Sequence, residues 1–162
     1  MTTSALSRGF GQFRQYTLTR YGLRLLPYAL ALYIAEIFLR YLPFKFSTGS
    51  NPIFSTLESW SGLTWVEPYG RFFTGGVEFL AVVLLFIPGL QVAGALFAFG
   101  VMGGAILSHL FTSLGIDPFN DGGKLFKEAV TVWLFAGIIL GLRRREILPF
   151  LKALVIDPNF RR

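Results

Sequence analysis

The chain of 162 residues contains no cysteine and a single histidine. Without cysteine it cannot form disulfides, Cys-ligated zinc sites, iron–sulfur clusters or dithiol redox centres. With one histidine it cannot hold a haem between two histidines of the same chain. His109 and the carboxylates match no known metal-ligand spacing, so we expect no metal site and no covalently bound cofactor. Any redox role would require a bound quinone or a partner subunit.

Charged residues are absent from a long part of the chain. None occurs between Phe79 and Ser108. Hydrophobic residues make up 53% of the sequence and aromatic residues 17%, and the mean hydropathy is +0.57. A soluble domain of this size cannot bury so much apolar surface. The composition therefore predicts an integral membrane protein.

Four apolar runs are each long enough to cross the ~30 Å hydrocarbon core of a bilayer as an α-helix. They cover residues 25–46, 69–87, 90–114 and 125–142. Pro88-Gly89 interrupts the uncharged stretch, which favours two helices joined by a tight turn over one long helix. The predicted fold class is therefore all-α, a membrane-embedded bundle of four helices.

The segment between the first two spans predicts a fifth, shorter helix. Asn51-Pro52 can begin it, with proline in the first helical position. Ile53, Leu57 and Trp60 would then lie on one face. We expect this helix to lie in the membrane surface as part of the first external loop. The alternative is a lid over a substrate site.

Basic residues are concentrated at the two ends of the chain. Residues 1–24 contain four arginines and no acid, and residues 143–162 contain six of the remaining lysines and arginines. Four spans place both ends on the same side, and the positive-inside rule makes that side the cytoplasm. The chain thus divides into a basic N-terminal arm, a membrane domain (residues 25–142) and a basic C-terminal tail. A transit peptide is the alternative interpretation of the arm.

The ionisable residues within the spans lie at mid-depth or in the outer half. Helical spacing places them in one polar stripe on each span. A charge that faces lipid at mid-depth costs ~3 kcal/mol or more, so we expect the stripes to face one another around a polar cavity that opens outward. The stripes are Tyr33, Glu36 and Arg40; Arg71, Thr74, Gly75 and Glu78; Met102, Ala105, His109 and Thr112; and Lys124, Glu128 and Thr131.

Several of these residues also have a purely structural interpretation. Glu36 and Arg40 can form an ion pair across one helical turn. His109 can be a hydrogen-bonded interior histidine, while Lys45 and Arg71 can anchor helix ends at the membrane surface. For Glu78 we expect either an ion pair with Arg40 or a role in binding a ligand or a proton.

Two G-x-x-x-G pairs predict close contacts between helices. Gly100 and Gly104 lie on the third span, and Gly137 and Gly141 lie on the fourth. Glycine at this spacing allows helix backbones to approach each other. A bulky side chain at Gly104 is therefore expected to separate packed helices.

The sequence resembles the DoxX/DoxD family of small four-helix membrane proteins, mainly through the pattern of residues in its second and third spans. The resemblance covers about residues 20–145. In this sequence Pro43-Phe44 stand where the family often has a glycine before its lysine. The matching residues are Arg71, Gly75, Glu78, Met102, Ala105, His109, Asp121-Gly122-Gly123, Leu125-Phe126 and Lys45.

This resemblance implies a multi-pass protein of a bacterial or archaeal inner membrane. Some members are associated with thiosulfate:quinone oxidoreductase, in which thiosulfate reduces a quinone. Our leading hypothesis is therefore a membrane subunit of a quinone-linked redox system. The alternative is a non-catalytic accessory protein, or a protein that handles small solutes or lipids. The expected partners are the bilayer, a redox subunit and further copies of the chain, and we expect no nucleic acid.

The leading hypothesis gives each ionisable residue a role at the outward cavity. Arg40, Lys45 and Arg71 would hold a small anion or a quinone carbonyl. Glu36 and Glu78 would balance charge or move protons. His109 would donate or accept a hydrogen bond.

Overall fold

The computed structural model describes the backbone of residues 3–146 and the side chains of residues 25–146. In this part of the chain every regular element is a helix. Four segments are long and apolar enough to cross a membrane: Leu25–Phe46, Val66–Phe86, Gln91–Phe111 and Lys124–Leu142. The predictions of a helical fold and of four helices long and apolar enough to cross a membrane are confirmed for the described residues. Which side of the membrane each end occupies stays a prediction.

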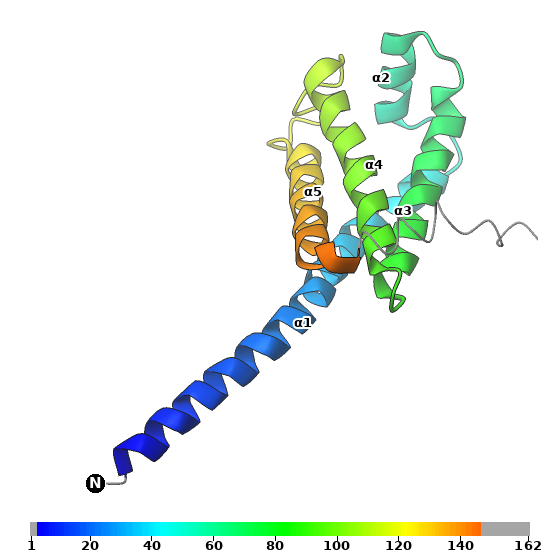
Figure 1. The fold of residues 1–162 in the computed structure, drawn as a ribbon. Coiled ribbons are helices and arrows are strands. Elements are labelled where there is room, and N and C mark those ends of the chain that lie inside the picture. The colour runs from blue at the N-terminus through cyan, green and yellow to red at the C-terminus, as the bar shows by residue number, and fades with distance from the viewer. Residues whose placement is uncertain (1–2, 147–162) are drawn as a thin grey trace, which may run out of the picture.

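The elements follow one another in the order α1 (Thr3–Phe46), α2 (Pro52–Ser61), the short π-helical turn η1 (Val66–Gly70), α3 (Arg71–Phe86), α4 (Gln91–Phe111) and α5 (Lys124–Leu142). At its N-terminal end α1 extends away from the bundle (Figure 1). The predicted N-terminal arm is thus helical from Thr3 and continuous with the first span. The predicted C-terminal tail lies largely outside the described residues.

Helices α1, α3, α4 and α5 enclose an apolar core. Helix α1 packs against α3 and α5, and α4 packs against the same two helices. Small residues fill much of this core and allow the helices to lie close together. Its fully buried members include Ala31 and Ile34 of α1, Ala81 and Leu85 of α3, Ala95 and Ala98 of α4, and Val132, Ala136 and Ile139 of α5.

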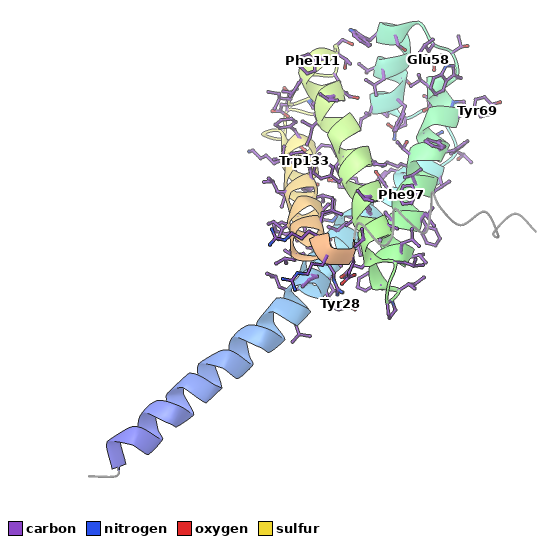
Figure 2. All side chains as sticks on the ribbon, viewed as in Figure 1. Tyr28, Glu58, Tyr69, Phe97, Phe111 and Trp133 are labelled. Carbon is purple, nitrogen blue, oxygen red and sulfur yellow. The ribbon has the colours of Figure 1, made fainter. Side chains whose placement is uncertain are left out.

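The outer surface of the bundle carries large apolar side chains. Tyr69, Phe97 and Phe111 lie on the outside (Figure 2), and Phe111 is 71% exposed. Phe73 on α3 and Leu107 on α4 are also exposed. So much apolar surface is unfavourable in water and typical of a bundle surrounded by lipid.

Local sequence signals predicted two element boundaries correctly. The side chain of Asn51 caps α2 by accepting a hydrogen bond from the backbone N–H of Ile53 at 3.0 Å, and Pro52 is the first helical residue. Pro88 and Gly89 lie in the turn between α3 and α4. The start of the second span differs slightly from the predicted residue 69, because α3 begins at Arg71 and the π-helical turn η1 precedes it.

Candidate functional site

A cavity of about 800 Å³ lies between the four spanning helices. Its volume falls within the range of ~300–1,000 Å³ that is usual for small-molecule sites. It occupies the end of the bundle that carries α2 and the α4–α5 loop. Most of its lining is apolar, with Phe38, Phe54 and Met102 among the larger side chains. The polar residues in its wall are Tyr41, Lys45, Asn51, Thr74, Glu78, Ser108, His109 and Glu128.

Glu78 is buried in the cavity wall, where it forms an ion pair with Lys45. Its side chain is 2% exposed, and Lys45 Nζ donates a hydrogen bond to its Oε1. The predicted pairing with Arg40 is wrong, because Arg40 binds carboxylates of α1 and α5 instead. The second carboxylate oxygen of Glu78, Oε2, is buried without a partner among the described residues. A ligand hydroxyl could supply the missing hydrogen bond.

Arg40 connects α1 to α5 through two carboxylates. Its Nε donates to Glu36 Oε1 at 2.8 Å, and its Nη1 donates to Glu128 Oε1 at 2.8 Å. The hydroxyl of Tyr41 donates to the other oxygen of Glu128 at 2.6 Å. Tyr41 and Glu128 line the cavity, whereas Glu36 and Arg40 do not.

The polar stripe of the first span faces outward, so its predicted inward orientation is wrong. The side chains of Glu36 and Arg40 are 52% and 41% exposed. The reason is that α1 turns its apolar stripe, including Ile34 and Phe38, into the core. Burying that stripe places Glu36 on the opposite side of the helix.

Arg71 is buried but does not line the cavity. Its guanidinium pairs with Glu67 at 2.9 Å. It also donates hydrogen bonds to the carbonyl oxygens of Lys45, Ser47 and Gly49, at 3.1, 3.1 and 2.9 Å. The last carbonyls of a helix lack partners within the helix, and Arg71 satisfies such groups at the end of α1. It thereby fixes the position of Lys45 and cannot hold an anion inside the cavity.

His109 lines the cavity and is held by the loop that follows α4. Its Nδ1 lies 2.5 Å from the carbonyl oxygen of Gly115, and its ring packs edge-on against Phe126. A carbonyl oxygen can only accept a hydrogen bond, so Nδ1 carries the proton. Nε2 is then the ring nitrogen left for a ligand, as an acceptor in the neutral ring and a donor in the charged one.

The cavity therefore brings together three of the six predicted site residues, Lys45, Glu78 and His109. It also includes five polar residues that were not among them: Tyr41, Asn51, Thr74, Ser108 and Glu128. Helical spacing already placed Thr74 and Glu128 on polar stripes, and that signal could have identified them. Nothing in the sequence distinguished Tyr41 from the other aromatic residues.

The predicted helix contacts at Gly100, Gly104 and Gly141 are wrong within the described chain. A Cβ atom at any of them would meet nothing within 4 Å. Gly100 and Gly104 instead line the cavity. Gly137 does pack against a neighbour, because a Cβ there would lie 3.5 Å from the ring of Phe99 on α4. Spacing alone does not show which face of a helix meets another helix.

Helix α2 forms one side of the cavity. Pro52, Ile53, Phe54 and Leu57 belong to its lining. Helix α2 therefore lies against the cavity, as the lid alternative requires. Its depth in the bilayer stays a prediction.

The chain matches no family model, no curated protein and no solved structure. The resemblance to the DoxX/DoxD family therefore stays a prediction that rests on the residues named above. Among the described residues, no group of three or more potential metal ligands occurs.

Proposed function

We propose that this protein binds a lipid-soluble quinone in the cavity, as the membrane subunit of a redox system. One observation carries the proposal: the cavity combines a mostly apolar wall with a few polar groups, Lys45, Glu78 and His109 among them. This composition suits an amphipathic small molecule, whose ring and tail contact apolar side chains while its polar atoms are oriented by hydrogen bonds.

The charges around the cavity favour a neutral ligand over a small anion. Lys45 is the one cation among the described lining residues, and Glu78 already neutralises it. Arg71 is occupied by Glu67 and backbone carbonyls, and Arg40 is shared between two carboxylates. An anion would have to enter an apolar cavity with no uncompensated positive charge, which is costly.

The polar residues match the two redox states of a quinone. Lys45 can donate a hydrogen bond to a quinone carbonyl, and so can His109 when its ring is charged. Glu78 Oε2, which has no partner among the described residues, can accept a hydrogen bond from a quinol hydroxyl. Reducing the quinone requires two electrons and two protons. The chain has no cysteine-ligated centre, so a partner subunit would deliver the electrons.

A lipid-handling role is the second candidate function. The observation that favours it is the apolar contribution of α2 to the cavity wall, which would also accept an acyl chain. The two candidates differ in the headgroup that they recognise. Titration with a benzoquinone that carries one isoprenyl unit, and separately with a lysophospholipid, therefore distinguishes them.

The decisive variant fills the cavity without disturbing the packing. Gly104→Leu places a side chain in open space at the cavity wall, and Gly141→Leu places one in open space at a position that does not line this cavity. We expect Gly104→Leu to weaken quinone binding about tenfold or more, because leucine would occupy the ligand's volume. Gly141→Leu should bind like the wild type. The measurement is calorimetric titration of protein in lipid nanodiscs, with empty nanodiscs as background.

Unchanged quinone affinity in the Gly104→Leu protein would refute a site in this cavity. Binding of the lysophospholipid but not of the quinone, again lost in Gly104→Leu, would support the lipid-handling candidate instead. Thermal unfolding of both variants checks that any loss of binding is not a loss of fold.

A further inference from the structure

The outer face of α1 exposes a carboxylate at mid-depth. Glu36 lies near the middle of the span Leu25–Phe46, and its side chain is 52% exposed. Leu32 and Leu39 lie at helical spacing around it and are 62% and 46% exposed. Lipid contacts such a face unless another protein covers it.

A carboxylate in this position is unfavourable against lipid. An ionisable side chain at the bilayer centre costs ~3 kcal/mol or more, and such residues usually face protein or water. Glu36 lies ten residues before Phe46, which is about 15 Å along the helix axis. Its side chain is too short to reach the membrane surface. Arg40, its partner, is itself 41% exposed and removes only part of the cost.

Among the residues whose side chains the structure describes, the ion-pair cluster around Arg40 has one cation for two carboxylates. Its single guanidinium binds both Glu36 and Glu128, and the remaining contact to Glu128 comes from the neutral Tyr41. With both carboxylates ionised, the cluster carries a formal charge of −1. A cation from outside the chain would balance it. The same face of a second copy of this chain would bring the same excess of carboxylate, so it would not balance the charge.

We propose that the face defined by Leu32, Glu36 and Leu39 docks a transmembrane helix of another protein that carries a lysine or arginine at mid-depth. The leucines pack against the partner helix, and Glu36 forms an ion pair with its cation. Arg40 then gives up its contact with Glu36 and keeps its hydrogen bond to Glu128 in the cavity wall, so that docking also alters the charge around the cavity. The proposal rests on the exposed charges of α1 and does not require the cavity to bind a quinone.

The test uses synthetic helices of defined sequence. Three labelled peptides are reconstituted with the labelled full chain in phosphatidylcholine vesicles: a Leu/Ala transmembrane helix, the same helix with one central lysine, and the same helix with one central glutamate. Energy transfer reports association. We expect the lysine helix to bind about tenfold more tightly than the other two, which is the scale of one polar contact between helices in lipid.

Glu36→Gln should abolish the preference for the lysine helix. Glu146→Gln is the matched control, because Glu146 is a carboxylate paired with an arginine outside the spans. Leu39→Trp keeps the charges and obstructs the face, so it should weaken binding of the lysine helix as well. It also provides a second variant if Glu36→Gln fails to fold, which thermal unfolding would show.

Equal binding of the three peptides would overturn the proposal, and so would a preference for lysine that survives Glu36→Gln in the folded protein. Energy transfer between two differently labelled copies of the chain, lost in Glu36→Gln, would show that a second copy covers this face. That result would also overturn the choice of partner.

Discussion

At the scale of single residues, Gly94 marks a close approach between two spans. A Cβ atom at this position on α4 would lie 2.6 Å from the backbone nitrogen of Leu85 and 2.8 Å from the carbonyl oxygen of Ala81. Both are backbone atoms of the α3 segment and cannot rotate away. Any side chain at Gly94 therefore forces the two helices apart.

Gly94→Ala is expected to lower the free energy of unfolding by about 1–3 kcal/mol, as overpacked sites do. Gly104→Ala is the matched control in the same helix, because its Cβ would meet nothing within 4 Å. Gly104→Ala should leave the free energy of unfolding unchanged, or raise it by up to about 1 kcal/mol through the better helix propensity of alanine. Denaturant unfolding in one detergent measures both. Equal losses of unfolding free energy in the two variants would contradict a close approach of α3 and α4 at Gly94.

Among the elements, the loop between α4 and α5 positions part of the site. Asp117 accepts hydrogen bonds from the backbone N–H groups of Asp121 at 2.9 Å and Gly122 at 3.1 Å. Gly122 has a φ of +78°, which glycine adopts without strain. The same loop presents the carbonyl of Gly115 to His109. The aspartate thus organises the segment that orients the cavity histidine.

Burial acts to raise the pKa of Asp117, but the backbone N–H groups of Gly123, Asp121 and Gly122 outweigh it and lower the pKa below its ordinary value. A carboxyl whose pKa is lowered in the folded state stabilises the fold above its unfolded pKa. That contribution is lost as the pH falls through the folded pKa.

Asp117→Asn should therefore unfold at a lower temperature than the wild type at neutral pH. The difference should shrink as the pH falls below about 4, because Asp117 is protonated first in the unfolded chain and, at lower pH, in the folded protein. Thermal unfolding at a series of pH values between about 7 and about 3 measures the difference. A difference that stays constant over this range would show that the charge of Asp117 does not stabilise the loop.

For the whole molecule, the two ends of the bundle differ in chemistry. Figure 1 shows α2 at one end and the C-terminal end of α5 at the other. The cavity, with Glu78 and His109, lies in the half that carries α2. Arg143, Arg144 and Arg145 follow α5 at the opposite end. The positive-inside rule predicts that the end of the bundle with the arginines faces the cytoplasm.

A reporter fused after Arg145 is expected to lie in the cytoplasm, and one inserted near Gly62 is expected to lie outside. The physical reason is the concentration of basic residues at the chain ends, which resist transfer across the membrane. Paired alkaline phosphatase and green fluorescent protein fusions at each site measure the side directly. Finding both sites on the same side would contradict four spans.

Much of the fold follows from the sequence because its signals are local. The length and hydropathy of the apolar runs determine four spans, and the proline of Pro88-Gly89 cannot continue the second span as a helix. Asn51 and Pro52 determine where α2 begins, since a cap and a first-turn proline act within a few residues. The sequence also showed which polar residues share a helix face.

Only the tertiary structure decided how each helix is rotated within the bundle. Periodicity groups Glu36 with Arg40 but does not say whether that face turns inward, because the answer depends on what the opposite face packs against. For the same reason the structure pairs Glu78 with Lys45, and it assigns the close helix contact to Gly94. Each of these outcomes is set by contacts between residues that are distant in the chain, and such contacts leave no local signal in the sequence.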